Sequence, residues 1–146
     1  MRNIVIDINI FVDFLFKRTG HEKAAEIFKH CIKSNVNGFV CAHEITTLFY
    51  FLNKSSQSKG KVKKTLSGIM KRFKVIEVNE RILQKALYSQ IDDYEDAVIE
   101  ISASENNAAF IITRNIKDFK KSAVKAVTPD EMLALIKSNV DTKNNV

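Results

Sequence analysis

The chain has few of the residues that interrupt regular secondary structure. Its 146 residues include only four glycines and one proline, which argues against a flexible linker and against a turn-rich β-sandwich. No stretch approaches the roughly 20 apolar residues that a membrane-spanning helix requires. An acid, Asp7, occurs within the first seven residues, a pattern that is not typical of a secretory signal. We therefore expect a cytoplasmic protein with no membrane segment.

Cysteine and histidine are also scarce. For the two cysteines, Cys31 and Cys41, the expected cytoplasmic location favours buried free thiols over a disulfide. The three histidines do not form a cluster with zinc spacing, and we interpret them as surface or boundary residues. They are His21, His30 and His43.

Each sign of charge is absent from one long stretch. No acid lies between Glu44 and Glu77, a segment that carries eight lysines and arginines, and no lysine or arginine lies between Lys85 and Arg114. The basic segment can attract a polyanion or can form a solvated helix face, and the sequence does not decide between the two. The net charge of the chain is +6.

Short apolar runs alternate with amphipathic stretches along the chain, and 45% apolar residues are enough for one core. The patterns predict strands at 3–7, 39–42, 73–78, 108–113 and 123–127, and helices at 10–16, 21–32, 43–52, 61–72, 81–91, 94–105 and from Pro129 onward. Such alternation is typical of a parallel sheet covered on both faces. We expect one three-layer α/β/α domain over residues 1–137, with four to five parallel strands, and a polar tail over 138–146.

Acidic residues occur where the predicted strands end. Asp7 ends the first strand, Glu44 lies just past the second, and Asp118 follows the fourth. Asp96 lies in the first turn of the helix that leads to the fourth strand. Because sites of open α/β sheets lie at the carboxyl ends of the strands, these side chains are expected to converge. Crowded carboxylates repel one another unless cations are present, and oxygen ligands favour Mg²⁺ or Mn²⁺.

Each of these acids also has a purely structural interpretation. Asp7 can cap the next helix, Glu44 can be a favourable acid at a helix N-terminus, and Asp118 can belong to a turn. Asp93, Asp96 and Glu100 share one helical face. Their charge requires compensation, either by a metal ion or by a neighbouring basic element.

Four segments resemble the motifs of the PIN-domain family, in the order in which that family has them. They are DINIFVD (7–13), EITTL (44–48), DYEDA (93–97) and TRNIKDF (113–119). The resemblance spans residues 3 to about 128, and the last two motifs are the more specific ones. Two positions depart from the family pattern: Ile8 replaces the usual threonine, and Asn115 stands where many relatives have aspartate. Whether Asp118 or Asn115 completes the site, and how many metal ions it holds, therefore stays open.

The resemblance implies a role for each matching residue. It implies that the catalytic, metal-binding acids are Asp7, Glu44, Asp96 and Asp118, with Asp93 as an additional ligand candidate. The polar groups that orient carboxylates and water would be Asn9, Thr113 and Asn115. Basic residues placed to hold RNA phosphates would be Lys61, Lys64, Lys71, Arg72, Arg114 and Lys117.

The activity implied by the resemblance is Mg²⁺- or Mn²⁺-dependent endonucleolytic hydrolysis of RNA. Small members of the family are typically toxins of toxin–antitoxin pairs; they form homodimers and are inhibited by an antitoxin segment that lies across the acidic groove. One alternative is a catalytically degenerate PIN module that binds RNA or protein, and another is a nuclease acting on structured DNA. A haloacid-dehalogenase-like phosphatase is the weakest alternative, because that chemistry needs a second aspartate where this chain has Asn9.

Overall fold

Five parallel strands form the centre of the protein. A computed structural model describes residues 2–144, with side chains up to residue 139. The strands are β1 (Arg2–Ile6), β2 (Val36–Cys41), β3 (Lys74–Ile76), β4 (Phe110–Ile112) and β5 (Ala126–Val127). Their order is β3-β2-β1-β4-β5, and every neighbouring pair is parallel. The predicted parallel sheet is confirmed.

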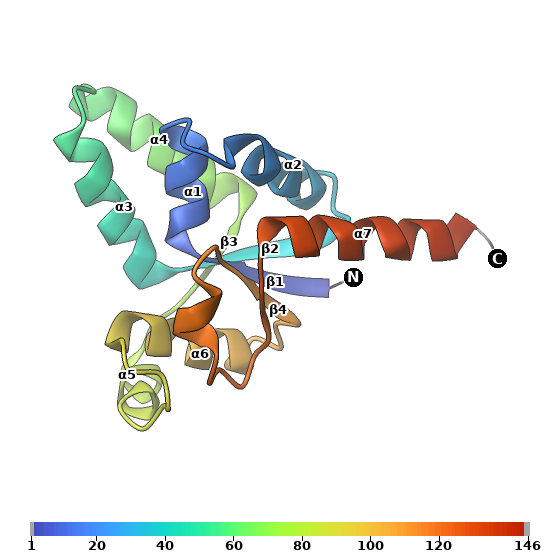
Figure 1. Cartoon of the computed structure of the whole chain (residues 1–146). Helices are drawn as coiled ribbons and strands as arrows, with labels where there is room; N and C mark the ends of the chain where they lie inside the picture. The colour runs from blue at the N-terminus through green and yellow to red at the C-terminus, as the bar shows by residue number, and fades with distance from the viewer. Residues whose placement is uncertain (1, 145–146) are drawn as a thin grey trace.

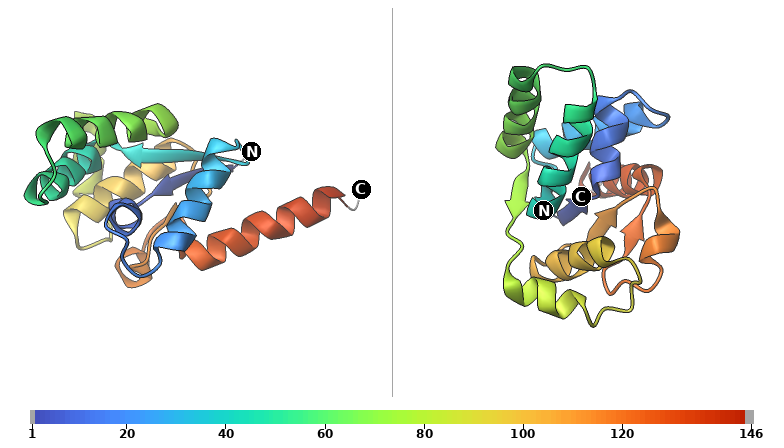
Figure 2. Two further views of the ribbon diagram at one scale, coloured as in Figure 1. Left: turned by 90° about the horizontal axis from the view of Figure 1, so that it is seen from above. Right: turned by 90° about the vertical axis from the view of Figure 1, so that its left-hand side faces the viewer.

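Helices cover both faces of this sheet (Figures 1 and 2). One face carries α1 (Ile8–Leu15), α2 (His21–Ile32), α3 (Ala42–Lys54), α4 (Lys59–Arg72) and α7 (Pro129–Asn144). The other carries α5 (Glu80–Ala86), α6 (Tyr94–Glu105) and the short 3-10 helix η1 (Ile116–Phe119). The three-layer α/β/α architecture is therefore confirmed.

The C-terminal helix is longer than expected. The helix α7 continues to Asn144, so it includes most of the segment 138–146 that we expected to be a polar tail; residues 145–146 lie outside the described part of the chain. Neither α7 nor any other helix within residues 2–144 combines the length and apolarity needed to cross a membrane. The two cysteines are free and buried, as predicted.

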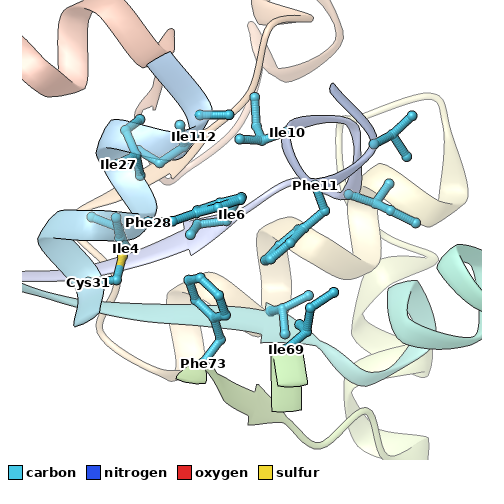
Figure 3. Close-up of a cluster of buried hydrophobic side chains, with 14 of the residues drawn as sticks. Ile4, Ile6, Ile10, Phe11, Ile27, Phe28, Cys31, Ile69, Phe73 and Ile112 are labelled. Carbon is cyan, nitrogen blue, oxygen red and sulfur yellow. The ribbon is translucent and has the colours of Figure 1, made fainter. Parts of the chain in front are cut away.

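An aromatic cluster fills the core between the sheet and α1, α2 and α4 (Figure 3). The ring centroids of Phe11, Phe28 and Phe73 lie 5.0–5.2 Å from one another, within the range in which aromatic pairs attract. Gly38 of β2 lies directly beneath this cluster. A Cβ atom at Gly38 would lie 2.8 Å from the Cys31 sulfur and 2.9 Å from a carbon of Phe73, so this strand position must lack a side chain.

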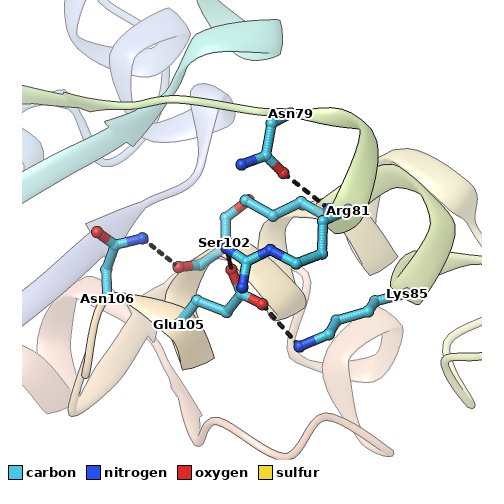
Figure 4. Close-up of polar contacts among 7 residues, drawn as sticks. Asn79, Arg81, Lys85, Ser102, Glu105 and Asn106 are labelled. Atoms are coloured by element: carbon cyan, nitrogen blue, oxygen red, sulfur yellow. Dashed lines mark hydrogen bonds and ion pairs between the residues drawn. The ribbon is translucent and has the colours of Figure 1, made fainter.

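Polar contacts attach α5 to α6 on the opposite face (Figure 4). The side chains of Arg81 and Lys85 each approach a Glu105 carboxylate oxygen to 2.8 Å. Asn79 caps the start of α5 by accepting a hydrogen bond from the Ile82 amide. The hydrogen bond from Lys85 and the nearby Arg81 charge lower the pKa of Glu105. These contacts hold α5 beside the helix that carries Asp96.

Candidate active site

The strand order places the candidate site at the middle of the sheet. From β1 the chain adds β2 and then β3 on one side, and later adds β4 and β5 on the other side. The boundary between β1 and β4 is therefore the topological switch point, where α/β sheets form their binding crevices. Asp7 directly follows β1, and its backbone amide donates to the Ile112 carbonyl at the end of β4.

The Asp7 carboxylate is oriented by the neighbouring strand. Its side chain is only 3% exposed, and Oδ2 accepts a 2.8 Å hydrogen bond from the Thr113 hydroxyl. The Thr113 hydroxyl oxygen in turn accepts a hydrogen bond of 3.0 Å from the backbone amide of Asn115. Although Asp7 occupies the N-cap position of α1, its side chain makes no capping hydrogen bond. The structural alternative for Asp7, a helix cap, is therefore not realised.

Glu44 lies beside Asp7 and is completely buried, with 0% exposure. One oxygen, Oε2, accepts a 2.8 Å hydrogen bond from the Ile8 amide, at the start of α1. The other oxygen, Oε1, is shielded from solvent and has no hydrogen-bond partner among the described residues. Burial and, second, the charge of Asp7 raise the pKa of Glu44 well above its ordinary value. A buried carboxylate oxygen without a donor is costly, which makes it a candidate cation ligand.

Asp96 brings a third carboxylate from the opposite layer. Asp93 caps α6 by accepting a 3.0 Å hydrogen bond from the Asp96 amide. The half-buried Asp96 side chain has its pKa raised to about 7, firstly by burial and then by the charges of Asp93, Asp7, Asp118 and Glu95. These electrostatic effects require proximity. The charges of Asp7 and Asp118 therefore act on Asp96, while the assignment of these acids to one catalytic site stays a prediction.

The acids of this crevice are not neutralised by basic side chains. Within residues 2–139, Asp7, Glu44, Asp96 and Asp118 form no ion pair with lysine or arginine. Among those same residues, no three His, Cys, Asp or Glu side chains are gathered closely enough to enclose one metal ion. The donor chemistry nevertheless fits a hard divalent cation: the ligands are oxygens, one of them unpaired, and they repel one another.

Glu100 does not belong to this crevice, although the sequence places it on the same helical face as Asp96. Its side chain is 5% exposed. One oxygen accepts a 2.6 Å hydrogen bond from the Ser89 hydroxyl, and the other accepts a 2.7 Å hydrogen bond from the Ala123 amide. We expected a metal ion or a basic element to compensate the charge of this acidic helix face. At Glu100 two neutral hydrogen-bond donors do so instead.

Three residues near the crevice were not identified from the sequence as parts of a site. Asp13 of α1 is 4% exposed and pairs with Arg114. Glu95 contributes to the raised pKa values of Glu44 and Asp96. The His43 ring is mostly shielded: burial lowers its pKa, while the Glu95 backbone and the charge of Asp7 act in the opposite direction. In the sequence, His43 could have been identified as a residue near the site because it directly precedes Glu44.

The predicted RNA-binding side chains lie in two different places. Lys61, Lys64 and Arg72 line an apolar groove between α1, α2 and α4, and Lys71 precedes Arg72 in the last turn of α4. Lys117 lines a cleft of about 290 Å³ together with two of the predicted metal-binding acids, Asp93 and Asp118. Arg114 lies next to Thr113, at the edge of the crevice. Asn9 is half-buried in the first turn of α1.

Comparison with known proteins agrees with this geometry. The PIN domain matches residues 3–117, whereas no curated protein sequence matches the chain. The fold resembles VapBC2 from Rickettsia felis bound to a DNA fragment from its promoter, with a TM-score of 0.67, 19% identity and coverage of 86% of this chain and 98% of that one. It also resembles DNA-bound VapBC from Salmonella typhimurium, with a TM-score of 0.69, 14% identity and coverage of 88% and 99%.

A third solved structure has the same fold: VapBC-1 from nontypeable Haemophilus influenzae, with a TM-score of 0.64, 18% identity and coverage of 88% of this chain and 98% of that one. At these identities the solved structures establish the fold, while the family match extends over most of the sequence. The family match over most of the sequence and the strand order lead to one assignment: the chain belongs to the PIN-domain family.

Proposed function

We propose that this protein is a Mg²⁺- or Mn²⁺-dependent endoribonuclease that hydrolyses RNA phosphodiester bonds. The observation that carries the proposal is a crevice of carboxylates with no basic partner, in which Glu44 retains a buried oxygen without a hydrogen-bond donor. The residues that would hold the cation are Asp7, Glu44, Asp96 and Asp118, with Asp93 as the additional candidate.

The protein's own groups are suited to keep these acids in position. The Thr113 hydroxyl fixes one oxygen of Asp7, and the Ile8 amide fixes one oxygen of Glu44. At Glu44 the other oxygen, Oε1, has no donor among the described residues and is left for a ligand. A bound divalent cation would polarise the phosphoryl group and lower the pKa of a water molecule. We assign Asn9 and Asn115 to the orientation of water or substrate at the edge of the crevice.

The test is cleavage of an RNA panel by the purified protein with Mg²⁺, Mn²⁺ or EDTA. We expect cleavage only with a divalent cation and a loss of at least about 100-fold in Asp7→Asn and Asp96→Asn, because each substitution removes a charged ligand. Asp130→Asn serves as the matched control, since Asp130 is an exposed acid that is paired with Lys23 of α2.

The other outcomes identify the rival functions. RNA binding without cleavage under any cation would indicate a degenerate PIN module. Cleavage restricted to structured DNA would indicate a DNA nuclease. Undiminished RNA cleavage in both site variants would contradict the assignment of the acids.

We also propose that the protein is the toxin of a toxin–antitoxin pair. The solved structures with this fold include VapBC complexes, and this chain has a groove of about 600 Å³ for a partner segment. The groove is floored by aromatic and aliphatic side chains, among them Phe14 and Ile32, and bordered by Lys61, Lys64 and Arg72. An amphipathic antitoxin segment with acidic residues fits this chemistry. A homodimer and a cytoplasmic location are part of the same proposal.

A further inference from the structure

One buried acid near the crevice has no place among the proposed cation ligands. Asp13 lies on α1, and its side chain is only 6% exposed. A carboxylate removed from water is costly unless a cation or hydrogen bonds compensate its charge. The Asp13 Oδ1 atom is shielded from solvent and makes no hydrogen bond among the described residues. Its charge must therefore be compensated electrostatically.

Arg114 provides that compensation. A guanidinium nitrogen of Arg114 lies 3.3 Å from Asp13 Oδ1, and it is the one lysine or arginine within residues 2–139 that pairs with this acid. Burial raises the pKa of Asp13, and the charges of Arg114 and, to a lesser extent, Arg18 oppose that shift. The Arg114 side chain as a whole stays 43% exposed. One edge of Arg114 thus faces a buried acid while other N–H groups face solvent.

The backbone beside Arg114 is fixed to the acidic crevice. The preceding residue, Thr113, is fully buried and donates to Asp7, and the following residue, Asn115, donates its amide to the Thr113 hydroxyl oxygen. Arg114 is therefore held from two directions, by its own backbone at the crevice and by Asp13 at the tip of its side chain. The charge of Asp7 also acts on Asp13, so this ion pair lies near the proposed cation ligands.

We propose that Asp13 is a positioning residue that holds the Arg114 guanidinium at the edge of the crevice, where it binds a phosphate group of the RNA. This inference rests on the proposed ribonuclease function. Arginine suits the role because its planar fork can contact a carboxylate on one edge and a phosphate on another. Fixing the side chain before RNA binds reduces the entropy lost on binding. The same contact keeps the guanidinium from occupying the place of a cation among the acids.

The experiment compares Asp13→Asn, Arg114→Gln and the double variant in steady-state cleavage and in equilibrium RNA binding with Ca²⁺ in place of Mg²⁺. We expect Arg114→Gln to raise KM for RNA about tenfold, as loss of a charge-assisted hydrogen bond predicts. Asp13→Asn is expected to raise KM by about three- to tenfold with a smaller change in kcat. The double variant should match Arg114→Gln alone, since Asp13 acts through Arg114.

The salt dependence of binding supplies a readout that a purely structural ion pair would not alter. Loss of one phosphate contact lowers the slope of log K against log salt by about 0.7 for single-stranded RNA, and we expect this in both single variants. Arg81→Gln is the matched control, because Arg81 also pairs with an acid, Glu105, on the opposite face of the sheet. Circular dichroism and thermal unfolding verify that each variant is folded.

Several outcomes would overturn this inference. It fails if the wild-type protein binds and cleaves RNA while Arg114→Gln has an unchanged KM and an unchanged salt dependence of binding. This test does not depend on the folding of any Asp13 variant. It also fails if Asp13→Asn behaves like wild type, or if its effect adds fully to that of Arg114→Gln. Absence of RNA binding and cleavage in the wild type would instead contradict the proposed function itself.

Discussion

At the level of single residues, three buried carboxylates are compensated in three different ways. Asp13 faces a guanidinium, and Glu100 accepts hydrogen bonds from a hydroxyl and a backbone amide. Glu44 has one amide donor and one oxygen without a partner. Because buried carboxylates are unfavourable without partners, the incomplete compensation at Glu44 is the strongest residue-level indication of a ligand site.

The incomplete compensation makes the stability of the cation-free protein depend on pH. The ordinary pKa values of Glu44 and Asp96 are 4.5 and 3.8, and both are raised in the folded protein, that of Asp96 to about 7. The folded state therefore binds more protons than the unfolded state, and the free energy of unfolding falls as pH rises. We expect this fall from about pH 4 to about pH 7 in EDTA, measured by urea denaturation.

The same measurement has two internal controls. Glu44→Gln should flatten the pH dependence, because glutamine cannot ionise. Mn²⁺ should also reduce it in the wild type, since a bound cation favours ionised carboxylates. A wild type whose stability in EDTA rises over this pH range, or a Glu44→Gln variant with the wild-type slope, would contradict the assigned electrostatics.

At the level of helices and strands, Glu100 connects α6 to two loops. Substitution Glu100→Gln retains one acceptor but turns an NH₂ donor toward either Ser89 or the Ala123 amide. We expect the free energy of unfolding to fall by about 1.5–3 kcal/mol, the range for hydrogen bonds to charged groups. Urea denaturation measures the change, and Glu26→Gln, at an exposed position of α2, is the control.

The activity of folded Glu100→Gln protein distinguishes a structural role from a catalytic one. Because Glu100 has both oxygens occupied by protein donors, we expect cleavage per folded molecule to stay close to that of the wild type. A loss comparable to that of Asp96→Asn would show that Glu100 belongs to the catalytic acids.

The close packing of β2 against the aromatic cluster gives a second element-level prediction. In Gly38→Ala the new methyl group would lie within 3 Å of both Cys31 and Phe73. We expect overpacking to lower the free energy of unfolding by about 1–3 kcal/mol. Gly60→Ala in α4 is the control: no atom lies within 4 Å of its added Cβ, and the substitution should stabilise the helix by about 0.5–1 kcal/mol. A neutral Gly38→Ala in chemical denaturation would contradict the close contact.

Element boundaries show where sequence patterns were sufficient. The helices predicted at 21–32 and 94–105 match α2 and α6. The second strand was predicted at 39–42, yet β2 begins at Val36. That difference follows from pairing with β1, which aligns Val36 with Arg2. The helix predicted at 81–91 ends at Ala86, where the chain turns so that Ser89 can reach Glu100.

At the level of the whole molecule, the fold separates an acidic crevice from an apolar groove. If the groove binds an antitoxin segment, Ile32→Asp should weaken that complex by at least about tenfold, because a charge would be buried at an apolar contact. Ile32 is 57% exposed in the free chain, so the variant should fold normally. Where a small protein is encoded beside this chain, isothermal titration calorimetry with that protein measures the effect.

Leu87→Asp provides the matched control, because Leu87 is 67% exposed and lies outside the groove. RNA cleavage by Ile32→Asp in the absence of the partner should equal that of the wild type. Unchanged partner affinity in Ile32→Asp, or equal weakening in Leu87→Asp, would place the partner elsewhere on the surface.

The sequence by itself determined the alternation of strands and helices and the parallel sheet, and it predicted that Asp7, Glu44, Asp96 and Asp118 lie near one sheet edge. These features follow from local periodicity and from the rule that the carboxyl ends of parallel strands meet at one edge. A single sequence carries this information because each of these features depends only on neighbouring residues or on the order of the strands and helices along the chain.

Only the tertiary structure decided which acids have partners. It assigned Arg114 to Asp13 and two neutral donors to Glu100, left one oxygen of Glu44 without a hydrogen bond, and placed Lys61 and Lys64 at the groove. The physical reason is that the charge and reactivity of a carboxylate depend on burial and on donors brought from distant segments. Those distances are set by packing of the whole chain, which spacing along the sequence does not specify.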